Sequence, residues 1–132
     1  AAMGLVNLKY LNQIFEKRAE QSLRYKELLS TLNVNFPKIE GIEKYNYSYF
    51  PILFSNESTL LKSIKLLQDN GIFSRRYFYP GLNSLDYTSG NTPISDDLSC
   101  KVLCLPLYHS LTAEEQRMIA RLLLRVQNNT GK

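Results

Sequence analysis

The chain has 132 residues, of which 44% are hydrophobic and 21% are charged, so it is long enough for one domain with a core and is not expected to be disordered. No apolar run approaches the ~20 residues that span a bilayer, and the N-terminus lacks the basic start of a signal peptide. The net charge is +4, but basic and acidic residues are interleaved, which argues against a nucleic-acid partner. We expect a soluble, cytoplasmic protein.

Residues 1–30 predict one long helix. Its apolar side chains recur at intervals of three and four residues and fall on one stripe, which comprises Ala1, Leu5, Leu8, Leu11, Phe15, Ala19 and Leu23. The segment opens without a residue that commonly caps a helix. A helix that begins in mid-pattern suggests that the chain is part of something longer.

The next two segments predict a loop and a strand. Residues 33–44 contain Pro37 and Gly41 among polar residues, as connecting loops do. Residues 45–54 are dense in aromatic and β-branched residues, which favours a strand. Pro51 cannot donate a backbone hydrogen bond, so we expect this strand to lie at an edge or to bulge there.

A second helix and a second strand should follow. Ser55 or Asn56 can cap the start of the helix, and Gly71 can supply the left-handed residue at its end. One face of this helix is expected to carry Leu60, Leu61, Ile64 and Leu67. Residues 72–79 predict the second strand.

The last third of the chain predicts a loop and two helices. Residues 80–93 form a long loop, and loops of that length in compact domains are often functional. Ser95 opens a short helix with acids in its first turn, and residues 102–105 are a brief apolar run. Thr112 and Glu115 form a capping box at the start of the last helix. This helix should have an apolar face of Met118, Ile119, Leu122, Leu123 and Val126 and an exposed row of Arg117, Arg121 and Arg125.

The order of these elements is helix, strand, helix, strand, loop, helix, helix. It predicts an α+β fold in which a long N-terminal helix is followed by a short sheet covered by helices.

The sequence lacks the motifs of a self-sufficient active site. It contains no P-loop, no GxGxxG and no GxSxG pattern, and no lysine stands in an apolar or glycine-rich setting. Cys100, Cys104 and the single His109 are too few for a zinc site, so we expect reduced, buried thiols and a surface histidine. We therefore assign no catalytic, cofactor-binding or metal-binding residue.

One group of side chains is suited to binding a ligand. It comprises Tyr47, Tyr49, Arg75, Arg76, Tyr77, Tyr79 and Asn83. Arginine binds phosphate through forked hydrogen bonds, and tyrosine offers a flat face and a hydroxyl, so the group suits a nucleotide diphosphate-sugar. The alternative is that the tyrosines pack in the core and the arginines are solvated, and composition alone favours that alternative.

Three stretches resemble the nucleotide-sugar aminotransferases of the DegT/StrS type. Residues 1–29 are similar to the long helix that leaves the large domain of that family. Residues 70–80 resemble its "GI…R.YFYP" segment, and residues 102–115 resemble its "LPLY…LT.EE" ending. The order and spacing of the three stretches are more specific than any of them alone.

The resemblance implies a type I aminotransferase fold, usually a homodimer with active sites at the subunit interface. PLP carries the chemistry in such enzymes, and the lysine that binds it lies in a large domain upstream of the stretch seen here. The amino group passes, usually from glutamate, to a keto-deoxysugar nucleotide in surface-polysaccharide or deoxysugar biosynthesis. On this interpretation residues 1–132 are one C-terminal small domain, with 1–30 as an inter-domain helix and 45–132 as the α+β part, inactive alone and without PLP.

The resemblance also implies where the substrate lies. It carries a substrate-facing role to Asn46, Tyr47, Arg76, Tyr77 and Tyr79. Many relatives have histidine near both segments, in an "HLF"-like strand and a "P.H" loop, whereas this chain has tyrosine and asparagine there, which resembles a branch acting on dTDP-linked sugars. A stand-alone, non-catalytic nucleotide-binding or interaction module remains the alternative. Separation from a large domain would expose Leu5, Leu8 and Phe15, so we expect self-association through the first helix.

Overall fold

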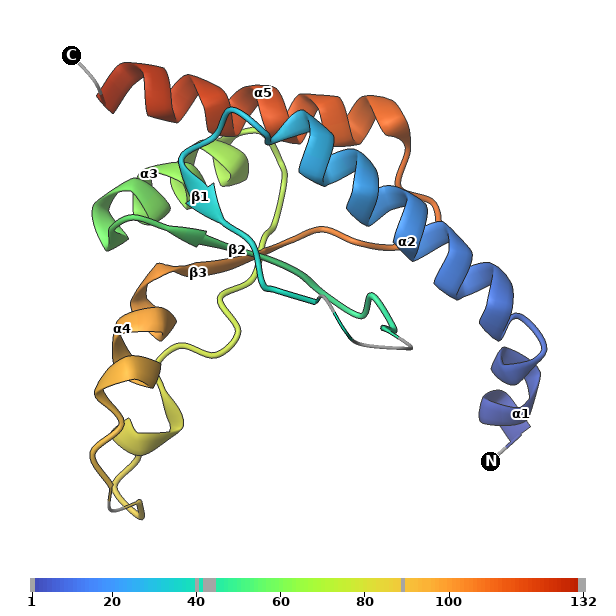
Figure 1. Cartoon of the computed structure of the whole chain (residues 1–132), viewed down its shortest axis with the longest axis horizontal. Coiled ribbons are helices and arrows are strands. Elements are labelled where there is room, and N and C mark those ends of the chain that lie inside the picture. The colour runs from blue at the N-terminus through green and yellow to red at the C-terminus, as the bar shows by residue number, and fades with distance from the viewer. Residues whose placement is uncertain (1, 40, 42–44, 89, 131–132) are drawn as a thin grey trace.

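The computed structural model describes residues 2–39, 41, 45–88 and 90–130 (Figure 1). The chain forms, in order, α1 (Ala2–Leu8), α2 (Leu11–Leu28), β1 (Val34–Asn35), β2 (Phe50–Phe54), α3 (Glu57–Asp69), the 3₁₀ turn η1 (Leu82–Ser84), α4 (Pro93–Lys101), β3 (Val102–Leu105) and α5 (Ala113–Thr130). The α+β class predicted from the sequence is confirmed.

The sheet is antiparallel, with the strand order β1-β2-β3. Two of its strands were not predicted as strands. β1 lies inside the segment predicted as a loop, and β3 is the apolar run at residues 102–105. Both are short, and it is pairing with β2 that defines them.

Pro51 lies in the central strand, so the prediction of an edge strand was wrong. Cys104, which faces Pro51, exchanges its backbone hydrogen bonds with Arg75 instead (2.8 and 3.1 Å). Pro51 therefore does not need to donate to β3. On the other side of β2, β1 pairs only with Leu53 and Phe54, so the missing N–H group of Pro51 interrupts no hydrogen bond of the sheet.

Three helices cover one face of the sheet. In Figure 1, α2, α3 and α5 lie above the sheet, whereas α4 and the loop with η1 lie below it. Alternation along β2 points every second side chain to the helices. The resulting core contains Phe50, Ile52 and Phe54 from β2, Tyr25 from α2, Leu60 and Leu67 from α3, Leu103 and Leu105 from β3, and Ile119 and Leu123 from α5.

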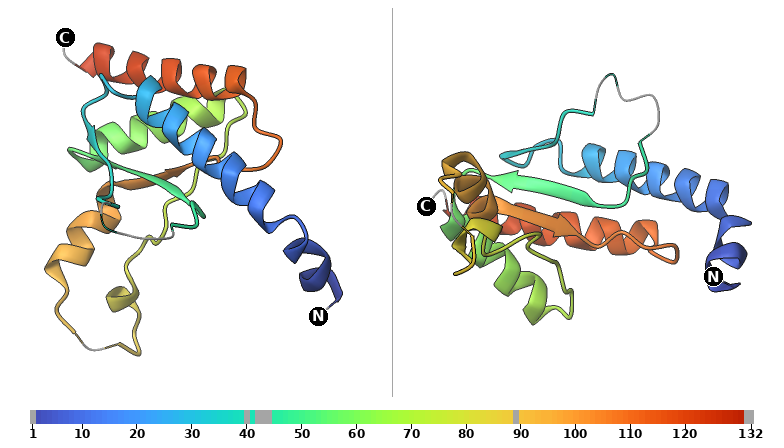
Figure 2. Two further views of the ribbon diagram at one scale, coloured as in Figure 1. Left: turned by 45° about the vertical axis from the view of Figure 1, so that its right-hand side comes forward. Right: turned by 90° about the horizontal axis from the view of Figure 1, so that it is seen from below.

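The predicted helix at residues 1–30 is two helices, separated by a turn at Lys9 and Tyr10. α1 and the N-terminal half of α2 project from the body of the molecule (Figure 2). Leu5, Leu8 and Leu23 of the predicted stripe are exposed, while Ala1 lies outside the described residues. Only the C-terminal half of α2 crosses the core, and the stripe does not face it. The side chains that α2 buries are Gln21, Ser22 and Tyr25.

Both predicted strands were too long. Residues 45–49 are not in a strand, and Tyr47 has a left-handed backbone with a φ of 48°. Within residues 72–79 only Arg75 pairs, through a single bridge to Cys104. Aromatic and β-branched composition alone does not supply the pairing partner that a strand requires.

Local signals at helix ends were confirmed. The side chain of Asn56 accepts a hydrogen bond from Thr59 N (2.9 Å), and Gly71 has a φ of +73° after α3. Glu115 Oε2 accepts from Thr112 N (2.7 Å), as the capping box requires. The exposed arginine row of α5 is also confirmed.

Three details of the helices differ from the prediction. Leu61 is 49% exposed and Met118 is 39% exposed, so neither lies on a buried face. α4 begins at Pro93 instead of Ser95, because proline is well suited to the first turn of a helix.

In the described part of the chain, no helix combines the length and the apolar character that a bilayer crossing would require.

Candidate functional site

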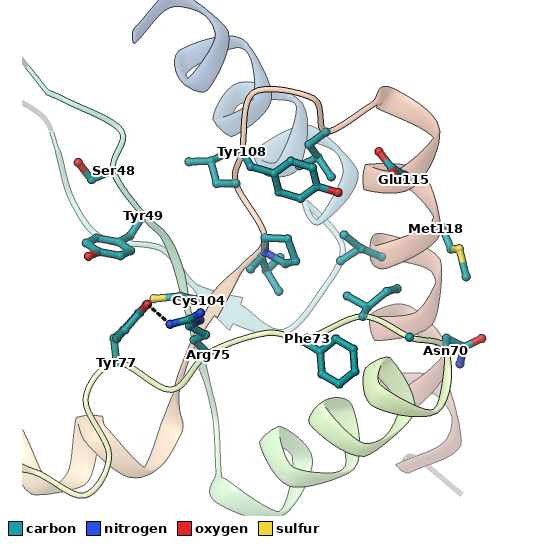
Figure 3. Close-up of a pocket in the computed structure, with 17 residues that line it drawn as sticks. Ser48, Tyr49, Asn70, Phe73, Arg75, Tyr77, Cys104, Tyr108, Glu115 and Met118 are labelled. Atoms are coloured by element: carbon teal, nitrogen blue, oxygen red, sulfur yellow. Dashed lines mark hydrogen bonds between the residues drawn. The ribbon is translucent and has the colours of Figure 1, made fainter. Parts of the chain in front are cut away.

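Two large cavities lie beside the sheet, and the first of them also borders α5. The first, of about 660 Å³, lies at the β3 edge, between the segment after α3 and the segment after β3 (Figure 3). The second, of about 1020 Å³, lies between the sheet, the loop with η1 and α4. Tyr77 lines both cavities.

Arg75 lines the first cavity and is exposed. Its backbone pairs with Cys104, which fixes the residue to the edge of the sheet. Its Nη1 donates a hydrogen bond to the hydroxyl of Tyr77 (3.1 Å), and its guanidinium carbon lies 5.9 Å from the centre of that ring. Within the described residues Arg75 forms no ion pair with a carboxylate.

Arg76 has a different environment, although it is the next residue. Its Nη2 donates to Glu57 Oε1 (2.8 Å) and to the carbonyl of Cys100 (3.1 Å). Its guanidinium carbon lies 3.5 Å from the centre of the Tyr79 ring, and its side chain is 15% exposed. The carbonyls at the end of α4 lack helical partners and attract a cation. Arg76 thus joins the start of α3 to the end of α4, which favours a structural role.

The tyrosines lie in two segments that meet at one contact. The rings of Tyr49 and Tyr77 pack edge to face at 5.0 Å. Tyr47 packs edge to face against Tyr45 at 4.9 Å. Asn46 is exposed, and its side chain accepts a hydrogen bond from Ser48 N (3.0 Å) in a local turn.

The structure brings only some of the sequence-predicted site residues together. Tyr77 contacts Tyr49 and Arg75, and Arg76 stacks on Tyr79. Asn46 and Tyr47 lie in a separate turn, of which Tyr47 borders a third, small cavity of about 30 Å³. A substrate-binding role stays a prediction for all five residues.

Among the residues of the first cavity that sequence reasoning missed are Phe73, Tyr108 and Glu115. Two hydrogen bonds from Thr112 lower the pKa of the Glu115 carboxyl, and the bond from the backbone N–H has a larger effect than the bond from the hydroxyl. This side of the cavity therefore carries a negative charge. Burial, and to a lesser extent the charge of Glu115, raises the pKa of Tyr108. The signal that could have found Tyr108 is its place in the "LPLY" stretch.

Buried side chains of α2 hold the wall that carries Tyr108. Gln21 Nε2 donates to the carbonyls of Tyr108 (2.9 Å) and Leu111 (3.0 Å). The hydroxyl of Tyr25 donates to the carbonyl of Pro106 (3.0 Å), and burial raises the pKa of this hydroxyl. The segment after β3 is therefore fixed at three carbonyls.

The described residues do not fit a site for PLP. Such a site requires a lysine amine that forms an imine with the cofactor. None of the described lysines lines the two large cavities, and Lys17, Lys65 and Lys101 pair with acids on their own helices. We derive no catalytic step from these residues.

The other reactive groups are dispersed. Within the described ranges, no three His, Cys, Asp or Glu side chains are grouped so that they could hold a metal ion. The thiols of Cys100 and Cys104 are free, as predicted; Cys104 is buried and Cys100 half-buried. Burial raises the pKa of the Cys104 thiol, and His109 is exposed.

Comparison with known sequences gives one family and related enzymes. The profile of the DegT/DnrJ/EryC1/StrS aminotransferase family matches residues 1–124. The chain is 36% identical over 134 residues to the dTDP-4-amino-4,6-dideoxy-D-glucose transaminase of Escherichia coli, which covers 94% of this chain and 36% of the relative. The chain spans about a third of the length of the curated relatives it matches (36% and 33%).

Solved structures share the fold. The aminotransferase TlmJ from Streptoalloteichus hindustanus superposes with a TM-score of 0.87 at 21% identity, over 96% of this chain and 35% of TlmJ. NtdA from Bacillus subtilis, solved with bound cofactor PMP, superposes with a TM-score of 0.79 at 26% identity, over 96% of this chain and 31% of NtdA.

Proposed function

The chain belongs to the DegT/DnrJ/EryC1/StrS aminotransferase family, and we propose that it is the C-terminal small domain of an enzyme that aminates a keto-deoxysugar linked to dTDP. The observation that carries this proposal is the 36% identity to a dTDP-4-amino-4,6-dideoxy-D-glucose transaminase along 94% of the chain. A transaminase that forms a 4-amino sugar consumes the corresponding 4-keto sugar. Glutamate is the proposed amino donor and the cytoplasm the proposed location.

PLP would be held by the remainder of the enzyme. When bound, this cofactor supplies an electron sink for the amino transfer. The bound PMP of NtdA supports a cofactor of this kind, because PMP is the aminated form of PLP. The chain described here is proposed to be inactive alone, because its described lysines do not fit the cofactor.

The role of this chain would then be to form one wall of the substrate cleft. The two large cavities support this role, because both are lined by Tyr77. Tyr79 follows Tyr77 by two residues, and Asn46 and Tyr47 precede Tyr49, whose ring packs against that of Tyr77. Arg76 would hold the segment of Tyr77 and Tyr79 in place through its hydrogen bonds to Glu57 and Cys100.

The proposed enzyme is a homodimer. Met3, Leu5 and Leu8 of α1 and Leu11 at the start of α2 are exposed apolar side chains. Such side chains support a contact surface on this part of the chain. They would pack against the remainder of the enzyme or, in the isolated chain, against a second copy.

A chimeric enzyme tests the proposal. The segment of the E. coli relative that aligns with this chain is replaced by residues 1–132, and the product is assayed with PLP, glutamate and the dTDP-linked 4-keto-6-deoxyglucose. We expect the amino sugar to form, whereas the relative without its aligned segment should form none. The chain alone, given the same reagents, should also form none.

Two results would contradict the proposal. One is a chimera that folds and takes up PLP, seen by its absorbance, but does not aminate the sugar. The other is turnover by the 132-residue chain alone. Tight nucleotide binding by the chain together with an inactive chimera would favour the alternative of a stand-alone binding module.

A further inference from the structure

We infer that the first cavity binds the diphosphate and nucleoside of the substrate, with Arg75 as the phosphate ligand. The identity of the ligand rests on the proposed function, while the site rests on the geometry of this chain. The inference assigns the phosphate-binding role within the Arg75-Arg76 pair to the first arginine and a structural role to the second.

The two arginines differ in whether their charge is already compensated. Arg76 contacts the carboxylate of Glu57 and backbone carbonyls, and its side chain is 15% exposed. Arg75 is exposed, and its side-chain partner is the neutral hydroxyl of Tyr77. A guanidinium without a carboxylate partner can offer a fork of N–H donors to a phosphate.

The shape and lining of the first cavity suit a nucleotide. Its volume of about 660 Å³ lies within the range of small-molecule sites. Its apolar side includes Leu105 and Pro106. Figure 3 shows Tyr49 and Tyr77 beside Arg75, and Phe73 and Tyr108 farther along the cavity. Aromatic faces of this kind stack nucleobases.

The charges of the cavity limit the ligand to a short anion. Arg75 lies at one end, and Glu115 lies near Tyr108 at the other (Figure 3). A nucleic-acid strand that ran along the cavity would place phosphates beside the carboxylate of Glu115. A nucleoside diphosphate places its charge at one end and its neutral base at the other.

The second cavity is larger, but its described lining lacks the charge that a diphosphate requires. None of the described residues that line it has a charged side chain. Phe78, Leu82, Ile94 and Leu98 line it together with neutral polar residues. A diphosphate placed there would lose hydration without a cationic partner. The first cavity is therefore the better site for the phosphates.

Titration of dTDP into the 132-residue chain, followed by amide NMR shifts, tests the inference. We expect saturable shifts at Phe73, Arg75 and Tyr77. Arg75→Gln should weaken binding by about ten- to a hundredfold, because charge-assisted hydrogen bonds are lost, and Arg75→Lys should weaken it less. Arg121→Gln removes another exposed arginine, on α5, and should leave binding unchanged. Thymidine, which lacks phosphates, should bind weakly and be insensitive to Arg75→Gln.

Three outcomes overturn the inference: no shifts at millimolar dTDP, equal affinities of the Arg75→Gln and wild-type chains, or shifts centred on Phe78, Leu82 and Leu98 of the second cavity. The spectrum of each variant without ligand shows whether it is folded. An active chimera combined with any of these outcomes refutes this site but leaves the proposed function intact. Binding as inferred combined with an inactive chimera refutes the function but leaves the site intact.

Discussion

The two halves of the N-terminal helical segment reverse the usual relation between polarity and burial. In the first half, Met3, Leu5 and Leu8 are exposed on a helix that projects from the body (Figure 2). In the second half, Gln21 and Ser22 are buried. The exposed half is thus the more apolar of the two.

The difference shows that residue type alone does not decide what is buried. The amide nitrogen of Gln21 donates to the carbonyls of Tyr108 and Leu111, which offsets part of the cost of burying it, whereas Gln21 Oε1 and Ser22 Oγ are buried without a partner among the described residues. In return, Gln116 Nε2 donates to the backbone carbonyl of Gln21 (2.8 Å). The apolar side chains of α1 have no such surroundings in the described chain, and exposed apolar patches of this kind mark contact surfaces.

The largest expected effect separates the two halves by stability. Leu29, directly after α2, is fully buried, so Leu29→Ala should lower the free energy of unfolding by about 2–5 kcal/mol. Leu5 is 65% exposed, and Leu5→Ala should change it by less than about 0.5 kcal/mol. Urea denaturation of both variants at low protein concentration measures the difference. Equal losses would show that α1 packs against the core in solution.

A smaller loss is expected at the buried amide. Gln21→Ala leaves two carbonyls of the segment after β3 without their donor, which should cost about 1–3 kcal/mol. Gln13→Ala is the matched control, because Gln13 is an exposed glutamine on the same helix. Denaturant unfolding of the pair is the measurement. If the two variants are equally stable, the hydrogen bonds of Gln21 do not stabilise the fold.

The exposed half should affect association more than stability. Leu8→Glu places a charge in the apolar surface of α1 and should weaken self-association of the chain. Asn7→Glu adds the same charge at a polar, exposed position of α1 and should weaken it less. Sedimentation velocity over a range of protein concentrations reports the oligomeric state. An unchanged state in Leu8→Glu would remove α1 from the contact.

Signals within one helix were the part of the fold that the sequence predicted well. The cap at Asn56, the left-handed Gly71 and the capping box at Thr112 each depend on residues within a few positions. β1 and β3 were missed because their definition depends on pairing with a strand far along the chain. The stripe of residues 1–23 was found, but periodicity does not tell which partner covers a stripe.

The candidate site shows the same limit. The sequence singled out both adjacent arginines, but their partners are remote: Glu57 lies 19 residues and Cys100 lies 24 residues from Arg76. Local pattern could not tell which guanidinium is engaged. Tyr108 and Glu115 were not selected as cavity residues because only the fold brings them opposite Phe73.

The smallest expected effect concerns Glu115. Its capping box with Thr112 lies at the end of the segment after β3, which Gln21 of α2 holds at Leu111. Hydrogen bonds from Thr112 lower the pKa of Glu115 below its ordinary value of 4.5. The folded chain therefore takes up this proton less readily than the unfolded chain does. The contribution of Glu115 to stability is fully present above pH 4.5 and is lost as the pH falls through the lowered pKa.

Glu115→Gln should accordingly lower stability at pH 7 and lose less of it on acidification than the wild type does. Glu16→Gln, an exposed change of equal charge on α2, should follow the wild-type profile. Thermal unfolding between pH 7 and 3 measures the three curves. Gln21 donates to the carbonyl of Leu111, the residue before Thr112. If the buried half of α2 positions the capping box in this way, Glu115→Gln should lower the stability of the Gln21→Ala variant less than it lowers that of the wild type. Parallel curves for Glu115→Gln and wild type would mean that the box forms without stabilising α5.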